Sequence, residues 1–186
     1  VLIPYAIYKR TRDTQVLQEN YTMMKKWVNY LESRAKARPD NLSEDEVSTF
    51  EDYTIDTGVD YGEWCEPGVN NMMNMRTPQT KVATAYFAYS SRLLSEIARI
   101  LGEENDAEYF VKVAENAKQA FRACATVDGE IVSERQADYV RALHFNLLNP
   151  EESKAAAAKL NELVVNAGYH LNTGFLSTPN ICRVLS

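Results

Sequence analysis

Residues 78–121 decide the fold and read PQTKVATAYFAYSSRLLSEIARILGEENDAEYFVKVAENAKQAF. Apolar side chains recur in both halves at steps of three and four residues, at Val82, Tyr86, Tyr89, Leu93, Ile97 and Ile100 and then at Ala107, Phe110, Ala114, Ala117 and Phe121. Such spacing places them on one face of a helix. Pro78 suits the first turn of a helix, and Gly102 suits the position just after its end. Asn105 with Glu108 is similar to a capping box at the start of the next helix, so the stretch predicts a helical hairpin.

The same plan extends to both sides of this hairpin. Before it, the sequence predicts a long helix capped by Asp13. The apolar stripe of that helix is Leu17, Tyr21, Met24, Val28 and Leu31. After the hairpin, helices are predicted to start at Ser133 and at Pro150, and Thr173 is predicted to cap a last one.

Short turns and long connections alternate between these helices. The short turns lie at residues 10–13, 102–105 and 148–150, and the long connections run over residues 37–78, 126–133 and 168–173. Within the second connection, Asp128-Gly129 predicts a tight turn between two short extended pieces. If the intervening segments are helices, all three long connections emerge at one end of the stack. A scaffold that carries a site at its mouth has this arrangement.

The turns at Gly102 and Asn149 lie about 45 residues apart, within the range typical of stacked helical pairs. Such pairs could close into a toroid or grow as an open solenoid. The chain opens on VLIPYAIY and stops at ICRVLS, both apolar, whereas domains usually begin and end in polar segments. We therefore expect an all-α fold whose antiparallel helical hairpins form an arc of a ring, with residues 1–186 a partial domain truncated at both ends. A complete small domain with buried termini is the alternative.

Composition argues against several classes of function. The net charge of −6, without a cluster of Lys and Arg, argues against a nucleic-acid partner. The apolar runs fall far short of the ~20 residues that a membrane span needs. The three cysteines show no CxxC spacing, and His144 and His170 lack partners at metal-ligand spacing. We therefore expect neither a disulfide framework nor a metal site. No compartment is indicated.

The segment with the richest chemistry is residues 60–68, DYGEWCEPG. It sets Tyr61 and Trp64 beside the carboxylates of Asp60, Glu63 and Glu66. Sugars have apolar ring faces and hydroxyl rims, which suit an aromatic platform surrounded by acidic hydrogen-bond acceptors. The alternative, which the residues alone favour, is a tryptophan that anchors a long loop among solvated carboxylates.

The spacing selects no catalytic pair. Glycoside hydrolysis uses two carboxylates. The predicted loops offer seven: Asp52, Asp56, Asp60, Glu63, Glu66, Glu130 and Glu134. His170 lies on a predicted loop and is the better histidine candidate for a site. The Met-rich run at residues 72–75 is interpreted as packing.

Three segments resemble the catalytic domain of bacterial α-L-rhamnosidases. They are residues 135–148, RQADYVRALHFNLL, residues 170–179, HLNTGFLSTP, and residues 61–64, YGEW. The last is similar to a Gly-Asp-Trp segment of the family, with Glu63 in place of Asp. The start of the chain, with IPY at 3–5 and KWVNYL at 26–31, matches the family in order, so the resemblance spans essentially the whole chain.

This resemblance implies an (α/α)6 barrel that hydrolyses terminal α-L-rhamnosyl linkages with inversion and without an organic cofactor. It also implies that the catalytic acid and base lie outside these 186 residues. The chain would then form a wall of the rhamnose pocket and be inactive alone. Trp64 would stack on the sugar, with Tyr61, Glu63, Asp60 and His170 as further substrate-binding residues. Glu in place of Asp at position 63 puts in doubt any role that requires the shorter side chain.

The expected partner is a rhamnose-containing glycan or glycoside, and we expect self-association through exposed apolar helix faces. Two alternatives stay open. One is a non-catalytic helical-hairpin module that binds protein or glycan. The other is a different toroidal glycosidase.

Overall fold

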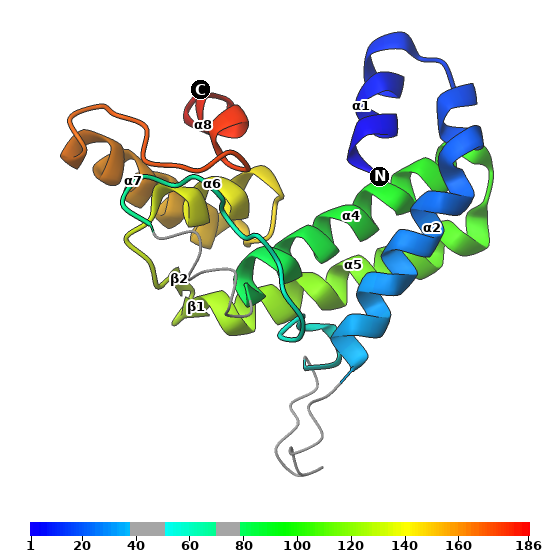
Figure 1. The fold of residues 1–186 in the computed structure, drawn as a ribbon, viewed down its shortest axis with the longest axis horizontal. Coiled ribbons are helices and arrows are strands. Elements are labelled where there is room, and N and C mark those ends of the chain that lie inside the picture. The colour runs from blue at the N-terminus through cyan, green and yellow to red at the C-terminus, as the bar shows by residue number, and fades with distance from the viewer. Residues whose placement is uncertain (38–50, 70–78) are drawn as a thin grey trace. The chain divides into compact units, whose positions relative to one another are not determined.

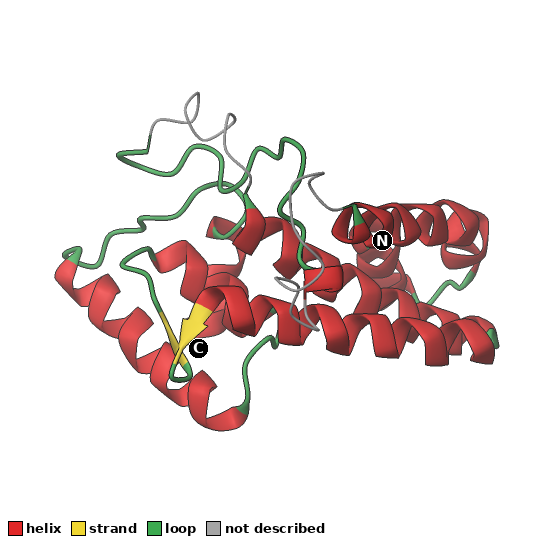
Figure 2. Cartoon of the chain, turned by 90° about the horizontal axis from the view of Figure 1, so that it is seen from below, coloured by secondary structure: helices red, strands yellow, loops and turns green. Residues whose placement is uncertain are grey.

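The structure, a computed structural model, describes residues 1–37, 51–69 and 79–186 (Figure 1). Helices dominate these residues (Figure 2). They are α1 Leu2–Thr11, α2 Gln15–Lys36, the 3-10 helix η2 Glu51–Tyr53, α4 Thr80–Leu101, α5 Glu104–Ala125, α6 Gln136–His144, α7 Pro150–Asn166 and α8 Thr178–Leu185. One short antiparallel pair, β1 Thr126–Val127 with β2 Glu130–Ile131, provides the strands of the described residues. The predicted all-α fold of helical hairpins is confirmed.

The chain divides into two compact units. The first comprises residues 1–57 and 86–120, and the second comprises residues 58–85 and 121–186. Helices α4 and α5 contribute residues to both. The Met-rich run at 72–75 and Pro78 lie outside the described residues. In the part of the chain that the structure describes, no helix is long and apolar enough to cross a bilayer.

The first unit is built around α2. Its predicted stripe is buried at Leu17, Met24, Val28 and Leu31 and half-buried at Tyr21. The N-cap of α2 is Thr14 rather than the predicted Asp13, whose carboxylate accepts from the backbone N–H of Gln15, the first helical residue, at 2.9 Å. Three tyrosine hydroxyls tie the helices of this unit together by donating to carboxylates: Tyr5 to Glu96, Tyr21 to Asp106 and Tyr109 to Glu32.

Helix α4 is buried on a wider face than the stripe predicted. Tyr86, Tyr89 and Ile100, which belong to the predicted stripe, are only half-buried. Residues outside it are buried instead, among them Ala85, Phe87, Ser91, Leu94, Ser95 and Ala98. Small side chains account for much of this set, and small side chains allow neighbouring elements to approach closely. A search for large apolar residues misses them.

Three predicted helix starts are wrong. Helix α5 begins at Glu104, because the chain reverses over Gly102 (φ 79°) and Glu103, so Asn105 already lies inside the helix. Helix α6 begins at Gln136 rather than Ser133, whose hydroxyl instead accepts from Arg135 N and donates to Asp138. Helix α8 begins at Thr178 rather than after Thr173.

The second unit contains the β1–β2 hairpin and helices α6, α7 and α8. The predicted Asp128-Gly129 turn is confirmed, with φ of 52° and 84°, as a type I′ hairpin turn requires. The predicted start of α7 is also confirmed. There Asn149 Oδ1 accepts from Glu152 N, and Glu152 Oε2 accepts from Asn149 N, both at 2.9 Å. This reciprocal capping box follows from the local sequence alone.

Candidate functional site

Residues in or next to the three predicted long connections contact one another within the second unit. Phe175 N, two residues beyond the third connection, donates to Trp64 O of the first connection at 2.9 Å. The Arg135 guanidinium, just after the second connection, forms an ion pair with Glu66 of the first. These contacts bring residues from distant parts of the sequence together within this unit.

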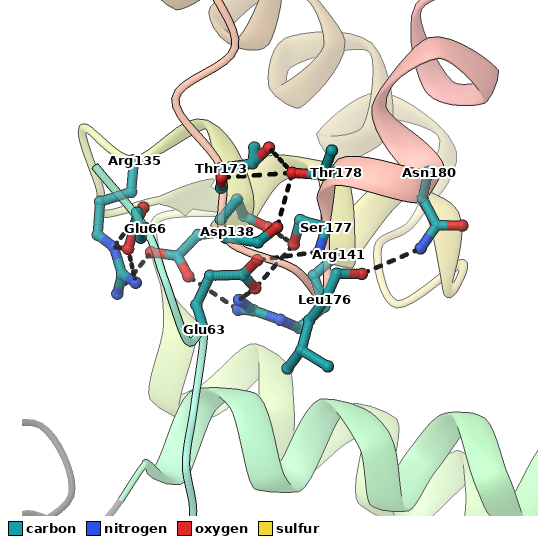
Figure 3. Close-up of polar contacts among 12 residues, drawn as sticks. Glu63, Glu66, Arg135, Asp138, Arg141, Thr173, Leu176, Ser177, Thr178 and Asn180 are labelled. Atoms are coloured by element: carbon teal, nitrogen blue, oxygen red, sulfur yellow. Dashed lines mark hydrogen bonds and ion pairs between the residues drawn. The ribbon is translucent and has the colours of Figure 1, made fainter. Parts of the chain in front are cut away.

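A buried polar network lies at this meeting point (Figure 3). We call it the Glu63 network, and its members are Glu63, Glu66, Arg135, Asp138, Arg141 and Ser177. Its centre is the Glu63 carboxylate, whose side chain is 0% exposed. Arg141 Nη2 donates to it at 2.9 Å, Ser177 N at 2.9 Å and Ser177 Oγ at 2.8 Å.

The network continues along α6. Arg141 Nη1 donates to Asp138 Oδ1 at 2.8 Å, and Ser133 Oγ donates to Asp138 Oδ2 at 2.7 Å. Burial by itself raises the pKa of Asp138. The charges of Arg141 and Arg135 and the two hydrogen bonds outweigh burial, so the pKa lies below its ordinary value. Asp138 is therefore a carboxylate at neutral pH.

Two arginines neutralise most of the negative charge of the network. Three carboxylates, those of Glu63, Glu66 and Asp138, face two guanidinium groups. Arg135 Nε donates to Glu66 Oε2 at 2.9 Å, and the Glu66 side chain is 3% exposed. Arg141 Nε is buried without a hydrogen-bond partner among the described residues, so the two Nη groups hold this guanidinium. An arginine fork suits such planar pairing.

The backbone of Glu63-Trp64 is also constrained by its neighbours. On one side Gly62 has φ 64°, and on the other Cys65 has φ 61°, a conformation that costs a non-glycine residue energy. Gly174 packs directly on this dipeptide, since a Cβ there would lie 2.4 Å from Trp64 O and 3.0 Å from Glu63 O. Glycine at position 174 is therefore required by space.

The aromatic side chains beside the network are open to solvent. Tyr61 is 63% exposed and Trp64 is half-buried, with ring centroids 5.4 Å apart and planes at 84°. This edge-to-face pair presents apolar ring surface over a rigid support. Asp60, next to Tyr61, is half-buried.

His170 belongs to the loop after α7. Its side chain is exposed, and its Nδ1 lies 3.0 Å from Ala167 O. The buried Gln136 side chain fastens this loop by donating to His170 O at 3.2 Å and accepting from Asn172 N at 2.9 Å. His170 is thus fixed through its backbone, with an accessible imidazole.

Sequence reasoning gave no role to Asp138, Arg141, Ser177 or Gly174. Asp138 and Arg141 stand three residues apart on a helix whose other residues from 136 to 142 are also buried. Opposite charges at this spacing on a buried helix are the signal that could have found them. Among the described residues, no cluster of His, Cys, Asp or Glu could hold a metal ion.

The whole chain, residues 1–186, matches the model of a family described as the bacterial alpha-L-rhamnosidase 6 hairpin glycosidase domain. An alpha-L-rhamnosidase of Formosa agariphila is 33% identical over 187 residues, which are 99% of this chain and 18% of that protein. One of Streptomyces avermitilis is 31% identical over 187 residues, which are 100% of this chain and 16% of that protein.

Solved structures of α-L-rhamnosidases are also similar to this chain. The crystal structure of Streptomyces avermitilis alpha-L-rhamnosidase complexed with L-rhamnose gives a TM-score of 0.78 at 30% identity, covering 98% of this chain and 16% of that one. The structure of alpha-L-rhamnosidase from Dictyoglumus thermophilum gives 0.77 at 27% identity, covering 98% and 19%. This chain therefore spans only 16 to 19% of the length of these relatives. It belongs to the bacterial α-L-rhamnosidase six-hairpin glycosidase domain family.

Proposed function

We propose that this chain is part of the catalytic domain of an α-L-rhamnosidase, a glycoside hydrolase that removes terminal α-L-rhamnosyl residues with inversion. The observation that carries the proposal is the family match over all 186 residues. The L-rhamnose complex of the Streptomyces relative supports rhamnose as the sugar. This chain contributes part of the pocket wall in that proposal.

The geometry of the second unit supports Trp64 as the residue that stacks on the sugar. A pyranose ring presents C–H groups on its faces, and an aromatic ring covers them without competing for hydroxyl hydrogen bonds. Tyr61 extends the aromatic surface, because its ring lies edge-to-face against that of Trp64. Asp60 and the exposed His170 imidazole are the proposed polar contacts to the hydroxyl rim.

The catalytic acid and base are proposed to lie elsewhere in the parent enzyme. Inversion needs one carboxylic acid on the glycosidic oxygen and one carboxylate that activates a water, both facing the sugar. Glu63 and Glu66 are buried and each is paired with an arginine, so neither suits proton transfer at an open site. The isolated chain is therefore expected to release no aglycone from an aryl α-L-rhamnoside.

Exposed apolar residues support the expected self-association of the isolated chain. Met23, Trp27 and Tyr30 recur on α2 at steps of four and three residues and are all exposed. Light scattering on the isolated chain measures this directly, and a monomer across a concentration series would contradict it.

The test of function uses the full-length parent enzyme and an aryl α-L-rhamnoside. Trp64→Ala should raise KM by about tenfold or more, because the aromatic face proposed to cover the sugar ring is lost. Trp27→Ala is the matched control, since Trp27 is also solvent-accessible but lies in the first unit. Normal kinetics of Trp64→Ala would refute its stacking role. A parent that hydrolyses no rhamnoside, with an isolated chain that binds protein or glycan, would favour the non-catalytic module instead.

A further inference from the structure

We propose that Ser177 and Arg141 are positioning residues of the sugar pocket, which act by holding the Glu63 carboxylate and thereby fix the place of Trp64. This inference rests on the proposed function of Trp64 as the stacking residue. It also gives Glu63 an inward role in place of a sugar contact.

The first support is that Glu63 already has three hydrogen-bond donors within the protein. A carboxylate offers about four acceptor positions. Three hydrogen bonds from Arg141 and Ser177 occupy both of its oxygens. The side chain is fully buried, so it has no surface to offer a ligand. The longer Glu side chain at this position is used to reach α6 and residue 177.

The second support is that one short segment holds both residues of the Glu63-Trp64 dipeptide. Ser177 binds the Glu63 side chain, while Phe175 N donates to Trp64 O at 2.9 Å. Gly174, in the same segment, contacts the peptide between them. Glu63 and Trp64 are adjacent in the chain, so a shift of the Glu63 carboxylate moves the Trp64 backbone.

The third support is that the residues holding Glu63 are themselves bound to helix α6. Ser177 Oγ also lies 3.3 Å from Ala137 O, on helix α6, and Arg141 is on the same helix and bound to Asp138. The carboxylate is therefore tied to helix α6 through Arg141 as well as to the segment before α8 through Ser177. Sites supported in this way keep the geometry that binding requires without reorganisation.

Ser177→Ala is the sharpest variant, because it removes one hydroxyl and leaves the ion pair and the Ser177 N–H bond in place. In the full-length enzyme it should raise KM for an aryl α-L-rhamnoside, and the inhibition constant of L-rhamnose, by about three- to tenfold. In a Trp64→Ala background the same change should have no further effect, since the residue it positions is gone.

Ser91→Ala is the matched control. Ser91 is also buried, and its hydroxyl donates to Phe87 O within its own helix in the first unit. It should leave both constants unchanged. If Ser177→Ala fails to fold, Glu63→Gln replaces it and is measured alone and in the Trp64→Ala background. Glu63→Gln keeps the side-chain volume and loses the charge.

Equal effects of Ser177→Ala in both backgrounds would overturn the proposal, because the network would then act independently of Trp64. Unchanged constants in the single variant, with Trp64→Ala still impaired, would also overturn it and leave the proposed function intact. A parent without rhamnosidase activity would instead refute the proposed function itself.

Discussion

The two units hold distant parts of the chain together with polar contacts of different burial. In the first, tyrosine hydroxyls on helices donate to carboxylates that each also pair with a lysine or an arginine, and all three tyrosines are accessible to solvent. In the second, arginines and carboxylates form a buried network that joins loops to α6. These solvent-accessible contacts join helices that already pack against one another. A buried network fixes the geometry of loops that have no regular structure of their own.

The largest expected effect is that of Arg141→Met. It leaves Glu63 and Asp138 buried with their shared guanidinium removed. Breaking a buried ion pair in this way costs about 3–5 kcal/mol. Hydrogen exchange in the parent enzyme measures the loss as faster exchange of amides in residues 62–66 and 174–178.

The matched control for Arg141→Met is Lys154→Met. Lys154 pairs with Glu151 at 3.0 Å, but the two side chains are 75% and 83% exposed. Its removal should change stability by less than about 0.5 kcal/mol. Similar losses of stability in the two variants would mean that the buried network stabilises the protein no more than an exposed ion pair does. The contrast between the two units would then be refuted.

A smaller loss is expected from Gly174→Ala. The new Cβ would lie 2.4 Å from Trp64 O, so the loop must shift. Overpacking of this kind costs about 1–3 kcal/mol. KM for an aryl α-L-rhamnoside should rise as well, because the shift displaces Trp64. Steady-state kinetics and hydrogen exchange on the same sample separate the two effects.

Gly102→Ala tests the cost of backbone strain without steric overlap. Gly102 has φ 79°, and nothing lies within 4 Å of a Cβ built there. We expect a loss of about 1 kcal/mol from the left-handed conformation, with KM unchanged. If Gly102→Ala also raised KM, the effect of Gly174→Ala could not be assigned to the contact with Trp64.

The two regions also differ in how far the sequence predicts them. The start of α7 follows from three residues within four positions: Pro150 occupies the first helical position, and Asn149 and Glu152 cap each other. The role of Glu63 depends on Arg141 and Ser177, which are 78 and 114 positions away. Local signals predict helices and turns because their partners are local. No spacing rule reports a partner that only the tertiary fold brings near.

The error at Ser133 has the same origin. A serine before an acidic and apolar stretch is a reasonable cap, and its hydroxyl does accept a backbone hydrogen bond, from Arg135 N at 3.1 Å. The helix nevertheless starts later, at Gln136, and the Arg135 side chain pairs with Glu66, 69 positions earlier. A long-range ion pair thus accompanies the extended conformation of a residue that local propensity assigns to a helix.

The smallest effect is expected in the first unit, from Tyr109→Phe. The Tyr109 hydroxyl donates to Glu32 at 2.7 Å, and this hydrogen bond, burial and the Glu32 charge raise its pKa to about 12. Tyr109 is 46% exposed, so solvent screens the interaction. We expect a loss of about 0.5–1 kcal/mol at pH 7, measured by hydrogen exchange of α2 and α5 amides, and an unchanged KM.

The raised pKa of Tyr109 determines how the stabilisation from the Tyr109–Glu32 hydrogen bond changes with pH. The protonated phenol is the form that the folded state binds, so the contribution is fully present below the ordinary tyrosine pKa of about 10. It is lost as pH rises through about 12, where the folded protein ionises. The difference between Tyr109→Phe and the parent should therefore stay constant from neutral pH to about pH 9 and shrink above about pH 10.

Tyr169→Phe is the control for that last comparison, since Tyr169 is 76% exposed. It should cost nothing measurable at any pH in this range. A change of KM in Tyr109→Phe would contradict the division between the units, because it would make a hydrogen bond between helices of the first unit part of the sugar site. An unchanged KM with a small, pH-dependent loss of stability would support the division between the units.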